Sequence, residues 1–137
     1  MRRYPEDFLS YIIGEVGSEK YRNFYVGEVD VLVDGKRSCA KFVSEVLKHF
    51  DLVSTPHATI KSTIQDMEDF GWMEIPFSSI EPGDVVVYDE NVNNRNHLGL
   101  YIGNGRVVSN STKERVIKFH DYEFDGTRKI IKVLALF

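Results

Sequence analysis

The chain has 137 residues, which predicts one domain over residues 1–137 with enough sequence to bury a core. Its composition, 42% hydrophobic and 28% charged, is that of an ordinary soluble globular protein. The single cysteine excludes an internal disulfide framework and an all-cysteine metal site. The formal net charge of −4 argues against a general nucleic-acid binder, because such proteins need a basic surface.

The sequence contains no apolar run near the roughly 18 residues that a membrane span requires. The two arginines at positions 2 and 3 are not followed by an apolar region, so no secretion signal is predicted. As written, the sequence therefore predicts a cytoplasmic monomer without membrane insertion. The alternatives are that it is one domain cut from a longer protein or that it is released by another route.

Three amphipathic segments in the first half of the chain predict helices. Residues 5–16 begin with a proline suited to a first helical turn and carry an apolar stripe. Residues 38–50 place apolar side chains at three- and four-residue spacing, and Cys39 falls on the same face. Residues 60–70 repeat this pattern and are followed by Gly71, a typical helix stop.

The second half of the chain changes to short apolar runs that are typical of strands. The pair Asn104-Gly105 predicts a tight hairpin turn, and Asp34-Gly35 predicts a further turn before the second helix. Helices followed by strands predict an α+β domain, with the helices packed on a C-terminal antiparallel sheet of about five strands. The runs that predict these strands cover residues 85–88, 98–102, 106–109, 116–119 and 130–136.

Cys39 lies at the start of the second predicted helix. A free cysteine on an apolar helix face is usually a small buried hydrophobe. In the first turn, however, unpaired backbone N–H groups and the helix dipole favour the thiolate form. The same N–H groups could hold a developing oxyanion. The position therefore favours a nucleophilic thiol.

A thiol nucleophile needs a base, and His97 follows a polar loop at 91–96 and begins a predicted strand. A lone histidine at a strand end is commonly polar surface. Gly99, on the same face of the strand, leaves room for another element to approach closely. The acceptor that orients the imidazole should come from the next hairpin strand, where Ser109 and Asn110 are the candidates.

Four stretches together resemble the NlpC-type cell-wall peptidases, a papain-like family of cysteine hydrolases. They occur in the family's order within roughly residues 38–111, and the resemblance implies a papain-like α+β fold. The stretches are Ser-Cys-Ala-Lys-Phe-Val at 38–43, the segment from Pro56 to Gly71, Pro-Gly-Asp-Val-Val-Val-Tyr at 82–88, and His-Leu-Gly-Leu-Tyr-Ile-Gly-Asn-Gly at 97–105.

By this resemblance Cys39 is the nucleophile and His97 the general base of amide hydrolysis. The family's third catalytic residue lies twelve positions after the histidine, which is Ser109 here. Asn110 has the expected chemistry but is one residue out of phase. Such a step turns a side chain to the other face of a strand unless a bulge intervenes. We favour Asn110 slightly, on its chemistry.

The resemblance also implies three substrate-binding residues. Tyr25 matches an aromatic that lines the family's site, and His57 falls where the family often has arginine. Lys41 replaces a usual glycine and could narrow the cleft or meet a substrate carboxylate, with a solvated surface role as the alternative. The histidines show no metal-ligand spacing, so the sequence predicts neither a metal nor a cofactor.

The leading hypothesis is a cysteine peptidase that cuts an amide bond near a D-amino acid in the stem peptides of peptidoglycan. The family typically cleaves between D-glutamate and the diamino acid, and this substrate rests on the resemblance alone. A papain-like amidase, deamidase or acyltransferase is the first alternative, favoured by the departures at Lys41 and Ser109. A binding module that kept the cleft and lost turnover is the second.

Overall fold

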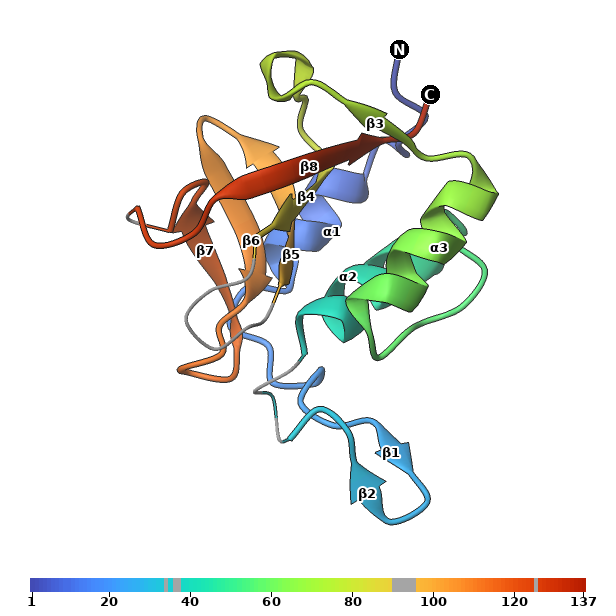
Figure 1. Cartoon of the computed structure of the whole chain (residues 1–137), viewed down its shortest axis with the longest axis vertical. Helices are drawn as coiled ribbons and strands as arrows, with labels where there is room; N and C mark the ends of the chain where they lie inside the picture. The colour runs from blue at the N-terminus through green and yellow to red at the C-terminus, as the bar shows by residue number, and fades with distance from the viewer. Residues whose placement is uncertain (34, 36–37, 90–95, 125) are drawn as a thin grey trace.

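The computed structural model describes residues 1–33, 35, 38–89, 96–124 and 126–137. The turn predicted at Asp34-Gly35 and the loop predicted at 91–96 extend outside these residues. The described chain forms helices, a short hairpin and a larger sheet (Figure 1). The elements are α1 (Phe8–Gly14), β1 (Tyr25–Val26), β2 (Val29–Asp30), α2 (Cys39–His49), α3 (Ile60–Phe70), β3 (Met73–Ile75), a 3-10 helix (Phe77–Ser79), β4 (Val85–Tyr88), β5 (His97–Gly103), β6 (Arg106–Asn110), β7 (Ile117–Asp121) and β8 (Ile130–Ala135).

The larger sheet is antiparallel, in the order β3-β8-β4-β5-β6-β7. Helices packed on this sheet confirm the predicted α+β class. The described sheet has six strands rather than about five. The additional strand is β3, whose residues Met73 and Glu74 are exposed, so that no apolar run indicates it in the sequence. Its pairing with β8 depends on contacts distant in the sequence.

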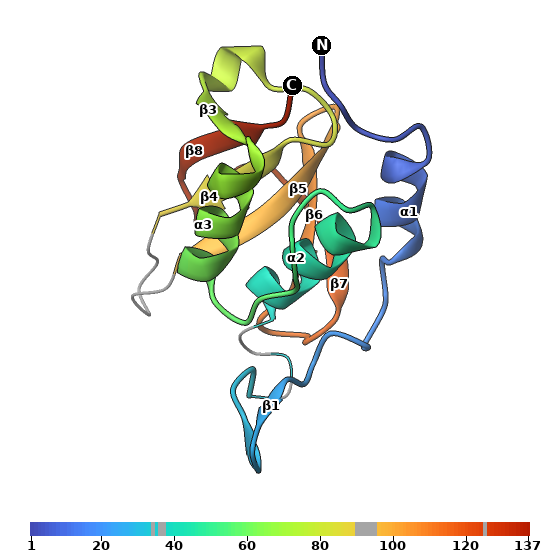
Figure 2. The same ribbon diagram turned by 90° about the vertical axis from the view of Figure 1, so that its right-hand side faces the viewer.

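The sheet is buried on both faces. Along β4, Val85 and Val87 join the core beneath the helices, whereas Val86 and Tyr88 join a second apolar cluster on the other face. Burial on both faces explains why β4 is an uninterrupted apolar run instead of an alternating one. Figure 2 shows α1, α2 and α3 lying together over the first face.

The predicted boundaries of α2 and α3 are confirmed to within one residue. The Thr59 side chain caps the start of α3, and Gly71 ends it in a left-handed conformation with φ of 114°. The first helix, Phe8–Gly14, is shorter at both ends than the predicted 5–16, and Asp7 before it supplies no side-chain cap. Within the described ranges, no helix is long and apolar enough to cross a membrane.

The N-terminal residues are bound to the sheet through Asp84, which is fully buried in the turn before β4. Its carboxylate accepts two hydrogen bonds of 2.9 Å from the Arg2 guanidinium and one of 2.6 Å from the Tyr4 hydroxyl. The backbone N–H of Glu81 also donates to it, at 2.8 Å. A buried carboxylate is tolerated here because charged and polar donors surround it.

Replacing Asp84 by Asn should destabilise the protein by about 3 kcal/mol, because Arg2, whose side chain is 10% exposed, would lose its buried counter-charge. The matched control is Glu81→Gln, since Glu81 also pairs with Arg2 but its side chain is 57% exposed. That control should cost at most about 1 kcal/mol. Urea unfolding of the three proteins measures both values, and equal losses would contradict the role of Asp84.

Candidate active site

Cys39 is the first residue of α2. The apolar face of this helix is buried in the core, and the helix lies against β5 and β6. This packing brings the half-buried Cys39 to the start of β5, where the backbone N–H of Leu98 acts to lower the pKa of its thiol. The N–H groups of Ala40 and of Cys39 itself, in the first turn of the helix, act on the thiol pKa in the same direction. The thiol therefore lies beside the strand that begins with His97.

His97 is buried at the first position of β5, and its ring contacts Ser109 on β6. His97 Nε2 and Ser109 Oγ are 2.9 Å apart. The pairing of Tyr101 with Val107 places these two side chains on one face of the sheet. The space beside Gly99 on this face is filled by the Val107 side chain, with which a methyl group on Gly99 would collide. Since Ser109 occupies Nε2, the ring nitrogen left for the thiol is Nδ1.

The contact that we expected from Asn110 is made by Ser109 instead. The side chain of Asn110 lies on the opposite face of β6, and its Nδ2 donates to the Gly35 carbonyl at 2.8 Å. The β6–β7 register runs without a shift from Arg106 to Asn110, so no bulge turns Asn110 toward His97. The slight preference for Asn110 is therefore not supported, and its amide contributes to the loop that precedes α2.

Burial favours the neutral forms of both site residues. It raises the pKa of the Cys39 thiol, although the N–H groups of Leu98 and Ala40 and the charge of Arg128 act to lower it. Burial also lowers the pKa of His97 well below its ordinary value, with smaller contributions from Arg128 and His120. The net direction for the thiol is thus opposite to the thiolate preference expected from the helix N-terminus alone.

An aromatic cover over His97 comes from the chain between β7 and β8. The ring of Phe124 meets the His97 ring edge-on, with centroids 5.3 Å apart, and stacks on His120 at 4.1 Å. The Arg128 guanidinium lies 5.3 Å from the centroid of the same ring. Sequence reasoning identified none of these three residues as part of the site. The pairing of His120 with Val107 would have placed it on the His97 face, but no local pattern indicates Phe124 or Arg128.

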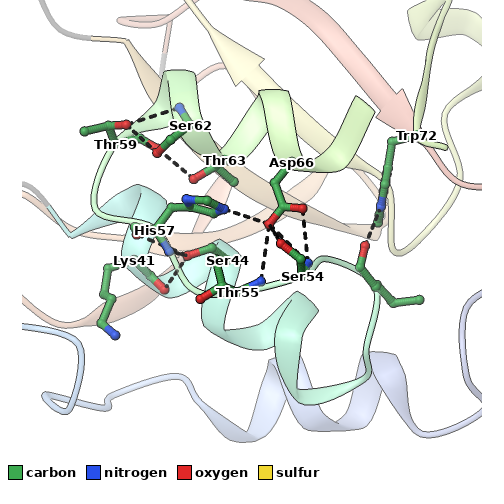
Figure 3. Close-up of polar contacts among 11 residues, drawn as sticks. Lys41, Ser44, Ser54, Thr55, His57, Thr59, Ser62, Thr63, Asp66 and Trp72 are labelled. Atoms are coloured by element: carbon green, nitrogen blue, oxygen red, sulfur yellow. Dashed lines mark hydrogen bonds and ion pairs between the residues drawn. The ribbon is translucent and has the colours of Figure 1, made fainter. Parts of the chain in front are cut away.

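His57 belongs to a polar network between α2 and α3 (Figure 3). Its Nε2 lies 2.7 Å from the Asp66 carboxylate, and its backbone N–H donates to Ser44 Oγ at 2.7 Å. Asp66 also accepts hydrogen bonds from the N–H and hydroxyl of Ser54. These contacts fix the connection between the two helices. The substrate-binding role of His57 stays a prediction beside this structural one.

Tyr25 and Lys41, the other two predicted substrate-binding residues, lie in different surroundings. Tyr25 is 61% exposed on the β1–β2 hairpin, which projects from the body of the protein (Figure 1). Lys41 Nζ lies 2.7 Å from the Glu45 carboxylate and 4.7 Å from the centroid of the Phe24 ring. Glu45 is the carboxylate that Lys41 meets in the free protein, and the substrate-binding roles of Lys41 and Tyr25 stay predictions.

The described chemistry of the site is that of a thiol, an imidazole and a hydroxyl. In the part of the chain that the structure describes, no three His, Cys, Asp or Glu side chains are grouped to hold a metal ion. The sequence model of the NlpC/P60 family matches residues 23–131, a span that includes Cys39, His97 and Ser109. The chain belongs to the NlpC/P60 family. Members of this family are generally cell-wall peptidases.

Solved structures of NlpC/P60 proteins share the fold. The chain is similar to NlpC2 from Trichomonas vaginalis, with a TM-score of 0.61 and 16% identity, and to NlpC1 from the same organism, with a TM-score of 0.61 and 17% identity. The similarity covers 92% of this chain in both cases, but 43% of NlpC2 and 41% of NlpC1. The chain thus spans less than half the length of these two proteins. A comparison with curated protein sequences found no significant match.

The Ser109 hydroxyl is expected to bias the tautomer of His97. By accepting a hydrogen bond from Nε2–H, it favours the tautomer whose Nδ1 is free to take a proton. Ser109→Ala should change the ratio of the two neutral tautomers about fivefold, because one hydrogen bond contributes about 1 kcal/mol. The ring nitrogen shifts of His97 in two-dimensional NMR spectra report this ratio. An unchanged ratio, or an equal change in Asn110→Ala, would contradict the assignment.

His120 is expected to make the protein sensitive to acid. Burial is the main cause that lowers its pKa from 6.5 to about 4 in the folded chain. As the pH falls, the His120 ring therefore takes up its proton at a higher pH in the unfolded chain than in the folded one. The free energy of unfolding should fall as the pH drops from 6.5 to about 4. In His120→Phe, which keeps a ring against Phe124, the fall should be smaller. Urea unfolding across this pH range measures it, and equal slopes in the two proteins would refute the prediction.

Proposed function

We propose that this chain is a cysteine endopeptidase that hydrolyses an amide bond near a D-amino acid in peptidoglycan stem peptides. The observation that carries the proposal is the contact between the His97 ring, at the start of β5, and Ser109 on β6. Leu98, the next residue of β5, supplies a backbone N–H that acts on the Cys39 thiol. Family membership supports the peptide substrate. In this proposal a monomer of the protein binds the stem peptide. Neither nucleic acid nor a membrane takes part.

Acylation begins with the Cys39 thiol and the His97 imidazole both neutral. The Cys39 sulfur attacks the carbonyl carbon while Nδ1 of His97 accepts the thiol proton. The tetrahedral intermediate then collapses, the C–N bond breaks, and the imidazolium gives its proton to the leaving amine. A thioester between Cys39 and the acyl half of the peptide remains. Because the amine carries the proton away, His97 is neutral again for the second half of the reaction.

Deacylation repeats these steps with water. The oxygen of a water molecule attacks the thioester carbon while His97 accepts a proton from that water. The C–S bond then breaks and the carboxylic acid is released. The sulfur recovers the proton from the imidazolium. The backbone N–H groups of Leu98, Ala40 and Cys39, which act on the thiol, are the candidate donors to an oxyanion formed on the attacked carbonyl.

The direct test is hydrolysis of a defined stem peptide, followed by mass spectrometry of the two products. The Cys39→Ala and His97→Ala variants should each lose activity by a factor on the order of 10³ or more, because nucleophile and base act as a unit. The matched control is His49→Ala, since His49 lies at the far end of α2 and stacks on Tyr11. Full activity in Cys39→Ala would refute the mechanism.

The same assay separates the two alternatives. Release of ammonia or acyl transfer from glutamine or lipid substrates, with stem peptides left intact, would favour the amidase, deamidase or acyltransferase hypothesis. Stem-peptide binding without cleavage, together with a Cys39 thiol that iodoacetamide does not alkylate, would favour a binding module. Either result would overturn the proposed peptidase while leaving the fold and family unchanged.

A further inference from the structure

Phe124 carries its ring into the candidate site from a backbone conformation that bulky residues rarely adopt. Its φ of 52° lies in the left-handed region, which is crowded for any residue with a side chain. Hydrogen bonds on both sides hold this conformation. The Phe124 N–H donates to the Asp121 carbonyl at 3.1 Å, and the Phe124 carbonyl accepts from the N–H and the hydroxyl of Thr127, at 3.1 and 2.6 Å. Such conformations persist where surrounding contacts determine them, and they gather at functional sites.

The Phe124 ring is held by aromatic side chains from three strands of the main sheet. It stacks on His120 of β7, with the ring centroids 4.1 Å apart. It meets Tyr88 of β4 and His97 of β5 edge-on, at centroid distances of 5.1 and 5.3 Å. The Tyr88 hydroxyl also donates to the Tyr122 carbonyl at 2.8 Å, which binds the connection between β7 and β8 to the sheet. These contacts hold the Phe124 ring against the imidazole of His97 and account for its unusual backbone conformation.

The imidazole of His97 needs such support, because Ser109 holds it at one point only. The hydrogen bond between Nε2 and Ser109 Oγ leaves the ring free to turn about the line that joins these two atoms. Rotation would move Nδ1, the nitrogen left for the thiol, and small displacements of a reacting group are costly. The planes of the Tyr88 and Phe124 rings make angles of 46° and 88° with the imidazole. Because these two rings contact it at different angles, they restrict this rotation.

We propose that Phe124 is a positioning residue whose ring holds the His97 imidazole in the plane where Nε2 meets Ser109 and Nδ1 is left for the thiol. This inference rests on the proposed function, because it assigns Phe124 a role in the reaction for which His97 is the base. Phe124 acts through His97 and not through the substrate. Its loss should therefore slow the chemical step and leave substrate binding unchanged.

The tautomer ratio of His97, measured by NMR, tests this role without a substrate. Phe124→Leu keeps an apolar side chain but removes the flat ring. If the ring holds His97 on Ser109, this variant should change the ratio about as much as Ser109→Ala does, roughly fivefold. The two effects should not add, so Ser109→Ala should change the ratio by less than about twofold in the Phe124→Leu background. Phe124→Tyr keeps the ring and should leave the ratio unchanged.

Phe119→Leu is the matched control. Phe119 is also half-buried, and the Arg106 guanidinium lies 4.2 Å from the centroid of its ring. It neighbours His120 on β7 but packs against the core beneath the helices, on the other face of the sheet. This control should lower resistance to urea as Phe124→Leu does, yet leave the tautomer ratio of His97 unchanged. An unchanged ratio in Phe124→Leu, or an equal change in the control, would overturn the inference. So would the absence of nuclear Overhauser contacts between the Phe124 and His97 rings in the unsubstituted protein, whatever the stability of the variants.

Cleavage of the stem peptide separates this inference from the proposed function. Phe124→Leu should lower kcat about 10- to 100-fold and leave KM within about twofold, because only the position of the base is lost. Phe119→Leu should leave both constants unchanged. A changed tautomer ratio in Phe124→Leu, with no cleavage by the unsubstituted protein, would support the hold of Phe124 on His97 and refute the peptidase. Cleavage with the same kcat in Phe124→Leu would support the peptidase and refute the role of Phe124.

Discussion

The candidate site depends on the burial of one face of α2 against the main sheet. Phe42, Val46 and Leu47 are fully buried there, and each contributes about 1.5–3 kcal/mol relative to an exposed position. The same packing holds the first turn of the helix at the start of β5, so the position of Cys39 follows from the core itself. A change that repacks this face would move the thiol relative to His97 even if no residue of the site were altered.

Burial of the sheet on both faces has a chemical consequence for the site. The cluster that contains Tyr88 and Phe124 extends over His97 and excludes water from the imidazole. Exclusion of water disfavours the thiolate–imidazolium pair in the free protein, as the pKa directions of Cys39 and His97 show. It also strengthens every electrostatic contact that a bound substrate would make, so the site is poised to respond to a charged ligand.

The amphipathic helices α2 and α3 and the continuous apolar strand β4 were predictable, because each is specified by its own residues. Two features were not. The three residues of β3, two of them exposed, become a strand only by pairing with β8. For the third site residue, side-chain chemistry favoured Asn110 while strand register favoured Ser109, and register decides which face a side chain occupies. Phe124 and Arg128 reach the site through a connection whose path the sequence does not specify.

The two ends of the chain lie side by side at the end of the molecule farthest from the β1–β2 hairpin (Figure 1). The Arg3 N–H donates to the Leu136 carbonyl at 3.0 Å, and the Leu136 N–H donates to the Tyr4 hydroxyl oxygen at 3.3 Å. Because the ends meet, a short linker could join them and a new opening could be placed at the exposed turn of the hairpin. Such a circular permutant would begin with β2, continue into α2 and end with β1.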